Sequence, residues 1–252
     1  ENVIEGKKFR FTLLSERLIR LEYSPTGSFD DRTSQRVIFR RFPNVKYMKS
    51  QTESLIQIST SYFTLNYDMN KPFLGSKLAP GSNLNILLNG TDKMWYYHHP
   101  EARNFGGLNY SLDDFSGKLK LGKGLYSTDG FAVLDDSDSY VLDNHNFIKR
   151  NEGNIDIYVF MYRKDLGLCL KDYYELTGYP ALVPRYALGN WWSRNDDYND
   201  ETLKDVVDTF SKHQIPISTV LLDKDWHIRK YDGKRHLKSG FTFNKDYFKN
   251  PL

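Results

Sequence analysis

The stretch RYALGNWWSRNDDYNDETLKDVVDTFSKHQIPISTVLLDKDWH, residues 185–227, decides the fold class of the C-terminal part of this chain. Its apolar segments RYALGNWW and IPISTVLLD predict two buried strands. The segment NDETLKDVVDTFSKHQ between them predicts a helix, because Asn199 is a suitable N-cap and acids fill the first turn. One apolar stripe of this helix is formed by Leu203, Val206, Val207 and Phe210. The order strand, helix, strand predicts a βαβ unit with parallel strands and a right-handed crossover.

A single βαβ unit is too small to be a finished domain. A two-stranded parallel sheet leaves both edges and much of its apolar surface uncovered. We therefore expect residues 181–252 to be the start of a larger α/β structure, and to be poorly ordered or prone to aggregation in isolation.

The N-terminal part has a different pattern. From residue 7 to about 165, short segments with apolar residues at every second position, such as KKFRFTLL, RLIRLEYS and NIDIYVFMYR, alternate with Gly, Asn, Pro and Asp. This pattern is typical of antiparallel strands and predicts a β-sandwich. The segment LGLCLKDYYELTG then predicts a short helix near 168–178 that stops at Gly178. The following YPALVP is extended, which places the domain boundary between 1–180 and 181–252.

Composition excludes several classes of protein. The 252 residues are 39% hydrophobic and contain no run of about 18 apolar residues, so we expect no membrane span. The 35 basic and 32 acidic residues are interspersed, and no basic stripe indicates nucleic acid as a partner. Aromatic residues make up 15%, which fits a β-rich core or surfaces that stack on sugars.

Cysteine and histidine usage indicates no cofactor. The single Cys169 rules out an intrachain disulfide and zinc-finger spacing, and its apolar neighbours predict a buried thiol. His98, His99 and His145 lack the company of metal ligands, so no metal site is predicted. The N-terminal residues lack the regions of a signal peptide, from which we expect a cytoplasmic protein.

Several motifs in order resemble one known family. YYELTGYPALVPRYALGNWW and the residues up to His227 resemble the entry to the catalytic barrel of glycoside hydrolase family 31, which contains α-glucosidases and α-xylosidases. Upstream, the motifs ERLIRLEYSPTGSFDDRTSQRVIFRRFP, NFGGLNYSLDD and GLYSTDGFAVLDDS resemble the N-terminal β-sandwich of the family. Downstream, SGFTFNKDYFKNP is similar to the segment after barrel strand 2. The resemblance covers essentially the whole chain.

The resemblance implies a particular fold and reaction. Family members place a (β/α)8 TIM barrel after the sandwich, with the active site at the C-terminal ends of the strands. They are retaining enzymes that use two Asp carboxylates about 5–5.5 Å apart, one as nucleophile and one as acid and base. In the family this pair comes from later strands, so the resemblance implies that no catalytic residue lies within residues 1–252 and that this chain alone is inactive.

Two aspartates at the end of the second predicted strand are candidate substrate ligands. The resemblance aligns Asp223 with the first Asp of a D-x-D pattern that binds hydroxyls of the sugar in the −1 subsite, a task that suits a charged acceptor. A loop-entry or capping role is the alternative. Asp225 is predicted to lie on the same side as Asp223 by strand alternation, as a second sugar contact or an orienting group. Trp226 is predicted to pack on the other side, and His227 to be a loop residue.

Four further residues are candidate substrate contacts by resemblance. Trp192 and Arg194 end the first predicted strand. Asn195 stands where the family often has an aromatic residue that lines the sugar pocket. Asp129 is similar to an Asp on a sandwich loop that some members extend over the barrel mouth, while a turn before Gly130 is the alternative.

These observations favour an enzyme acting on carbohydrate. We expect the N-terminal part of a retaining α-glycosidase that hydrolyses terminal α-linked glucosyl or similar residues of an oligosaccharide. Its other partner is then the rest of the barrel, in the same polypeptide or a second segment. A non-catalytic carbohydrate-binding β-sandwich module and a family 31 transglycosylase or lyase remain open, as does association into a homo-oligomer.

Overall fold

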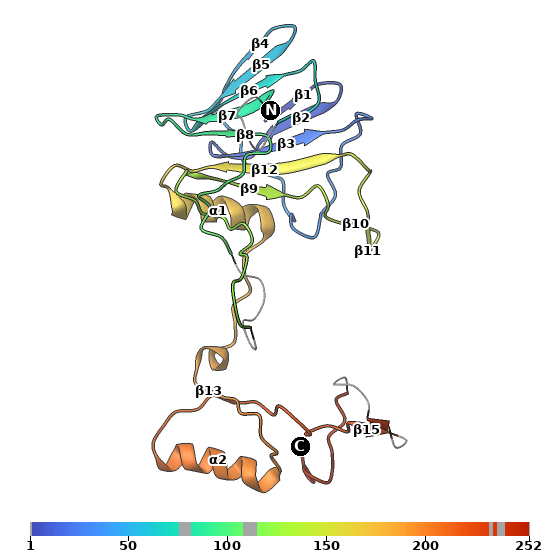
Figure 1. Cartoon of the computed structure of the whole chain (residues 1–252), viewed down its shortest axis with the longest axis vertical. Coiled ribbons are helices and arrows are strands. Elements are labelled where there is room, and N and C mark those ends of the chain that lie inside the picture. Colours follow the sequence, from blue (N-terminus) through green and yellow to red (C-terminus); the bar gives the residue numbers. More distant parts are fainter. Residues whose placement is uncertain (1, 76–81, 108–114, 232–233, 236–239, 252) are drawn as a thin grey trace. The chain divides into compact units, whose positions relative to one another are not determined.

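The computed structural model describes residues 2–75, 82–107, 115–231, 234–235 and 240–251 (Figure 1). The last part of the NFGGLNYSLDD motif, residues 108–114, and Ser239 of SGFTFNKDYFKNP lie outside the described residues. The chain forms two compact units, Glu1–Pro180 and Ala181–Leu252, and each is described by itself. No helix among the described residues is long and apolar enough to cross a membrane.

The first unit contains two five-stranded antiparallel sheets. The first sheet has the strand order β1 (Val3–Glu5), β2 (Phe9–Leu13), β3 (Leu18–Tyr23), β12 (Ile155–Met161), β9 (Phe131–Asp135). The second has the order β4 (Met48–Gln51), β5 (Leu55–Ser59), β6 (Phe63–Asp68), β7 (Leu84–Leu88), β8 (Met94–Tyr96). A separate hairpin is formed by β10 (Val141–Asp143) and β11 (Asn146–Ile148). The prediction of antiparallel strands from alternating apolar residues is therefore confirmed.

One apolar core joins the inner faces of the two sheets. Alternate residues of β2 and β6 are buried, as the two-residue period of a strand requires. Phe11 of β2 packs edge to face on Tyr67 of β6, with ring centroids 5.5 Å apart, and stacks on Phe73 at 6.1 Å. Much of the high aromatic content is therefore used in the core of a β-sandwich.

The outer face of the first sheet is covered by helix α1 (Leu166–Thr177) (Figure 1). Cys169 and Leu176 of this helix are buried against Tyr158 and Phe160 of β12. β12 consequently has almost no exposed side chain, because one face meets the sandwich core and the other meets α1. The helix ends as predicted at Gly178, whose φ of 94° suits glycine and whose N–H donates to the Tyr174 carbonyl.

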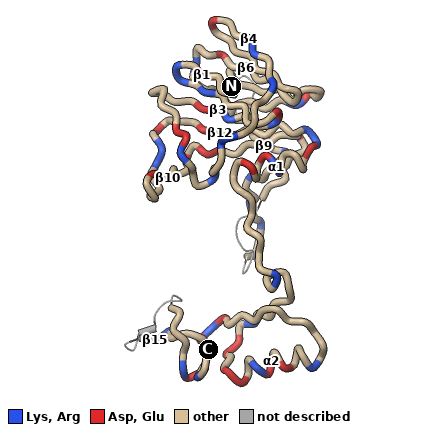
Figure 2. Tube along the Cα trace, turned by 180° about the vertical axis from the view of Figure 1, so that it is seen from behind, with Lys and Arg blue, Asp and Glu red and all other residues tan. Residues whose placement is uncertain are grey.

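Buried ion pairs beside this core were not predicted. Arg20 of β3 is 2% exposed and donates to both carboxylate oxygens of Asp156 of β12 at 2.8 Å. Asp136 is fully buried and accepts from Ser34 at 2.9 Å and from Arg150 at 2.5 Å. The buried charges thus have partners of opposite sign, while the remaining Lys, Arg, Asp and Glu are scattered along both units (Figure 2).

The second unit contains the predicted parallel strand pair. β13 (Trp191–Trp192) pairs in parallel with β14 (Thr219–Val220), and helix α2 (Asp200–Lys212) connects them. Asn199 caps α2, since its side chain accepts from the N–H groups of Glu201 and Thr202 and its own N–H donates to the Thr202 hydroxyl. A further antiparallel pair is formed by β15 (Lys230–Tyr231) and β16 (Lys234–Arg235).

The predicted length and burial of the two strands were wrong. Arg185–Leu188 forms the short 3-10 helix η1, and each strand has only two residues. Trp191 is 46% exposed, and no residue of α2 is buried, although Phe210 packs edge to face on Trp192 at 5.4 Å. The reason is physical: within this unit neither edge of the parallel pair has a described strand beside it, so its apolar side chains have too few partners.

Candidate functional site

The loops that follow the two parallel strands lie side by side. The N–H of Leu221 donates to the carbonyl of Trp192 at 2.9 Å, which continues the pairing to the ends of both strands. Just beyond, Nζ of Lys224 lies 3.2 Å from Oδ1 of Asp197 and bridges the two loops. Because the strands are parallel, both loops leave from the same edge, where ligands of open and closed α/β sheets bind.

A hollow of about 360 Å³ lies at this edge. Two of the predicted substrate ligands, Asn195 and Asp223, line it together with Trp226. Asp223 is exposed and no described group pairs with its carboxylate. An unpaired carboxylate, an amide and an indole combine hydroxyl acceptors, a donor and an apolar face, which is the composition that suits a sugar.

Asp225 does not share this hollow. Its φ of 58° is left-handed, an uncommon conformation for a non-glycine residue, and it reverses the alternation on which the prediction relied. The Asp225 carboxylate accepts from Nη1 of Arg229 at 2.9 Å and lines a neighbouring hollow of about 800 Å³. The prediction that Asp223 and Asp225 share a side was therefore wrong, and Trp226 lies with Asp223 instead.

Trp192 and Arg194 also lie away from the hollow. The Trp192 ring packs on Phe210 and its Nε1–H donates to the hydroxyl of Tyr198 at 3.1 Å, which ties β13 to its following loop and to α2. Arg194 is exposed, with its Nε 3.4 Å from Oδ2 of Asp196. These contacts give Trp192 a packing role and leave Arg194 on an exposed loop.

Asp129 belongs to the first unit. It lies in the turn before Gly130, where φ is 76° and an added Cβ would lie 2.6 Å from the Arg163 carbonyl oxygen. Its carboxylate is 3.5 Å from Nη1 of Arg103. The turn is the geometry that the sequence offered as the alternative to substrate contact.

His227 is a site residue that sequence reasoning missed. It is 7% exposed and lines both hollows of the second unit, and its backbone forms an antiparallel bridge with Phe243. Neither ring nitrogen has a hydrogen-bond partner among the described residues. The burial of a single histidine in a loop cannot be predicted from apolar periodicity. In the fold, the bridge to Phe243 brings the 240–248 segment against His227.

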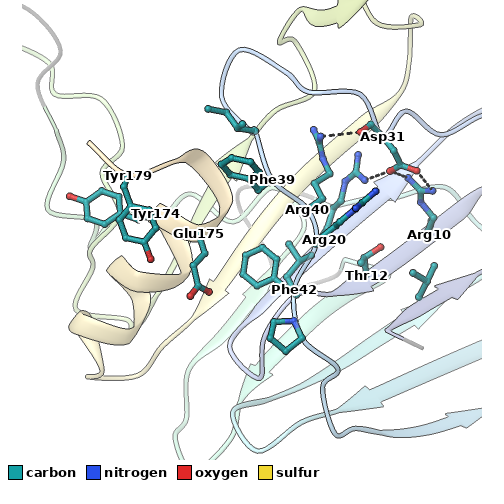
Figure 3. Close-up of a pocket in the computed structure, with 15 residues that line it drawn as sticks. Arg10, Thr12, Arg20, Asp31, Phe39, Arg40, Phe42, Tyr174, Glu175 and Tyr179 are labelled. Atoms are coloured by element: carbon teal, nitrogen blue, oxygen red, sulfur yellow. Dashed lines mark hydrogen bonds and ion pairs between the residues drawn. The ribbon is translucent and has the colours of Figure 1, made fainter. Parts of the chain in front are cut away.

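A hollow of about 750 Å³ on the sandwich is lined by arginines that mostly have partners (Figure 3); Nη2 of Arg40 is buried without a hydrogen bond and lies 3.7 Å from Oδ2 of Asp136. Arg10 and Arg20 both bind the Asp31 carboxylate, with donor–acceptor distances of 2.6–2.9 Å. Arg40 donates from Nε to the Tyr158 hydroxyl at 2.8 Å and from Nη1 to the Arg32 carbonyl at 2.8 Å. Because each of these guanidinium groups already donates to a carboxylate, a hydroxyl or a carbonyl of the sandwich, we assign them a role in stabilising the fold. Among the described residues no group of three His, Cys, Asp or Glu is arranged to hold a metal ion.

Part of the chain matches a known protein family. Residues 180–252 match the glycosyl hydrolases family 31 TIM-barrel domain. An α-xylosidase of Saccharolobus solfataricus is 29% identical over 156 residues, which are 59% of this chain and 20% of the relative. The α-glucosidase 2 of Bacillus thermoamyloliquefaciens is 34% identical over 100 residues, 39% of this chain and 11% of the relative. These matches support a fragment of a glycoside hydrolase family 31 protein.

The fold agrees with this family assignment. A family 31 dextranase of Flavobacterium johnsoniae, solved with isomaltotriose, superposes with a TM-score of 0.56 at 18% identity over 100% of this chain and 34% of that chain. This chain thus spans about a third of the dextranase and a fifth of the α-xylosidase.

Proposed function

We propose that this chain is part of a retaining α-glycosidase and that its second unit holds a terminal α-linked glucosyl or similar sugar. The observation that carries the proposal is the unpaired carboxylate of Asp223, which lines one hollow with Asn195 and Trp226 at the ends of parallel strands. Asp223 accepts hydrogen bonds from two neighbouring hydroxyls, Asn195 contributes its amide, and the Trp226 indole contacts the apolar face of the ring. The match of residues 180–252 to a barrel domain supports an enzyme over a non-catalytic module.

The proposed chemistry needs carboxylates outside this chain. Retention requires a nucleophile and an acid/base carboxyl about 5–5.5 Å apart across the glycosidic bond. Asp225 already pairs with Arg229 and lines the other hollow, so it makes no such pair with Asp223. We therefore assign the pair to polypeptide beyond Leu252, as the family resemblance implies, and give Asp223 a substrate-holding role.

Two assays test this function. Residues 1–252 are expected to release no 4-nitrophenol from 4-nitrophenyl α-glucoside or α-xyloside, whereas the product of the complete reading frame is expected to turn over at least one of them. In that longer protein Asp223→Asn is expected to lower kcat/KM about 100-fold, since the charged acceptor is lost in the transition state as well as in the ground state.

The matched control is Asp208→Asn, which changes an exposed carboxylate of α2 that pairs with Lys204 and is expected to leave kcat/KM unchanged. Turnover by residues 1–252 would contradict the assignment of the catalytic pair to polypeptide beyond Leu252. Equal activity of the two variants would contradict the proposed role of Asp223.

A further inference from the structure

An exposed aromatic side chain lines the hollow at the ends of the parallel strands. Phe241 is 91% exposed and borders the same hollow of about 360 Å³ as Asn195 and Asp223. It comes from the segment that follows β16, so the hollow is built from three separate parts of the second unit. Its ring is open to a ligand that enters the hollow.

The backbone beside Phe241 is held by hydrogen bonds to the loop that carries Trp226. The N–H of Ile228 donates to the Thr242 carbonyl at 2.9 Å, and the N–H of Asn244 donates to the Trp226 carbonyl at 2.8 Å. The first of these bonds is made by the residue next to Phe241 in the chain. The exposed ring is therefore presented at a set place beside the hollow.

Two aromatic rings of this hollow meet at an angle. The ring centroids of Trp226 and Phe241 are 6.3 Å apart, and the ring planes are tilted by 45°. Phe243, which lines the neighbouring hollow, packs edge to face on Trp226 at 5.2 Å and helps to fix the orientation of the indole. The apolar surface offered to a ligand thus consists of two rings that are not coplanar, which suits two successive sugar rings better than one.

The charges of the hollow favour a ligand without an anionic group. The charged residues that line it are Asp223, Lys224 and Arg229. Nζ of Lys224 lies 3.2 Å from Oδ1 of Asp197, and Nη1 of Arg229 donates to the Asp225 carboxylate at 2.9 Å. Both cations therefore have carboxylate partners, and the carboxylate of Asp223 accepts from hydroxyls in the function proposed above.

We propose that Phe241 is a specificity-determining residue that packs on the neutral sugar residue to which the terminal sugar is linked. The inference rests on the proposed function, in which Asp223, Asn195 and Trp226 hold the terminal sugar. With that sugar in place, Phe241 is the other large aromatic side chain among the described residues that line the hollow. The substrate class is then an α-linked disaccharide or oligosaccharide, whose leaving group has a C–H face for the ring to contact.

The experiment compares two substrates that share the terminal sugar and differ in the leaving group. One is an α-linked disaccharide, and the other is the α-glycosyl fluoride, whose leaving group has no ring. In the product of the complete reading frame, Phe241→Ala is expected to lower kcat/KM for the disaccharide about tenfold, the effect of one lost aromatic contact. The value for the fluoride is expected to change less than about twofold. An equal loss for both substrates, or no loss for the disaccharide, would overturn the proposal.

Matched variants separate stacking on a sugar from packing within the fold. Phe241→Tyr keeps the ring and is expected to hold kcat/KM for the disaccharide within about twofold. Phe241→Leu keeps an apolar side chain without a ring and is expected to show the selective loss. Full disaccharide activity of Phe241→Leu would show that no ring is needed and would refute the proposal.

The control is a second exposed aromatic ring of the same segment. Tyr247 is 37% exposed and lines the neighbouring hollow. Tyr247→Ala is expected to leave the ratio of the two kcat/KM values unchanged. A ratio shifted as far as in Phe241→Ala would mean that the effect does not depend on this hollow.

Asp223→Asn distinguishes failure of this inference from failure of the proposed function. The variant is expected to lower kcat/KM for both substrates, because the terminal sugar is common to them. If it lowers neither value, the role proposed for Asp223 fails, and the inference that rests on it fails too. If it lowers both while Phe241→Ala also lowers both equally, only the inference about Phe241 fails.

Discussion

The two α-helices in the described part of the chain differ in their local sequence signals and in their environments. α1 has no side-chain cap, yet Cys169, Asp172 and Leu176 are buried against the first sheet. α2 has a complete capping box and acids in its first turn, yet none of its residues is buried. Local signals therefore do not decide whether a helix is buried; burial depends on whether partners are present to cover its apolar stripe.

The same contrast applies to charge in the two units. In the sandwich, Arg20 and Asp156 form a buried two-bond pair, and Arg17 binds Asp172 of α1 at 2.9 Å. In the second unit, the pair between Lys204 and Asp208 is exposed on the surface of α2. Buried pairs must be kept intact because an isolated buried charge is strongly unfavourable, while exposed pairs contribute little.

The largest expected effect comes from breaking the buried pair. Arg20→Met leaves Asp156 with Arg150 as its remaining cation, at 3.1 Å, and is expected to destabilise the sandwich by about 3 kcal/mol. Urea denaturation followed by circular dichroism of the strands measures this change. Lys204→Met, which removes the exposed cation of α2, is the matched control and is expected to leave the urea midpoint of the sandwich unchanged. Equal midpoints for the two variants would show that the buried pair contributes no more to stability than the exposed pair.

A smaller effect is expected from shortening the apolar stripes of the two helices. Leu176→Ala creates a cavity beneath α1, where the side chain is 0% exposed, and is expected to cost about 2 kcal/mol. Leu203→Ala on the half-exposed stripe of α2 is expected to cost less than about 1 kcal/mol. Hydrogen exchange of peptides from each helix measures both free energies of opening. A larger loss for Leu203→Ala would show that α2 is packed in solution.

The smallest expected effect is on acid stability. Burial opposes ionisation of Asp31, but hydrogen bonds from Arg10 and Arg20 outweigh it and lower the pKa of this carboxyl. A lowered folded-state pKa stabilises the fold above the unfolded value of about 3.9, and this contribution is lost as the pH falls toward the folded value. Asp31→Asn is therefore expected to reduce sandwich stability at pH 6 more than at pH 3, as thermal melts at the two pH values would show. An equal loss at both would mean that Asp31 acts without its charge.

Much of the fold follows from the sequence because its signals are periodic. The alternation in FRFTL, LIRLEY and FTLNYD predicts strands, and Gly178 and Asn199 predict helix ends. β4 was missed because its residues MKSQ are all exposed, so backbone pairing with β5 alone makes it a strand. Apolar periodicity in a sequence indicates a buried face, so a strand without a buried face is not recognised from it.

The candidate site was only partly predictable. The order of strand and loop places Asn195 and Asp223 at one edge, and the structure brings both to one hollow. The left-handed backbone of Asp225 and the burial of His227 depend on contacts with the 240–248 segment. No periodic pattern in the sequence around residues 225–227 indicates these contacts. The burial predicted for residues 185–192 assumed neighbouring strands that the described residues do not supply.

We propose that the sandwich completes its core within this chain while residues 181–252 depend on further barrel strands. Hydrogen exchange measured by mass spectrometry on a monodisperse monomer of residues 1–252 tests it directly. We predict strong protection of β12, which is buried on both faces, and weak protection of α2 and β14. Protection of α2 and β14 equal to that of β12 would contradict the claim.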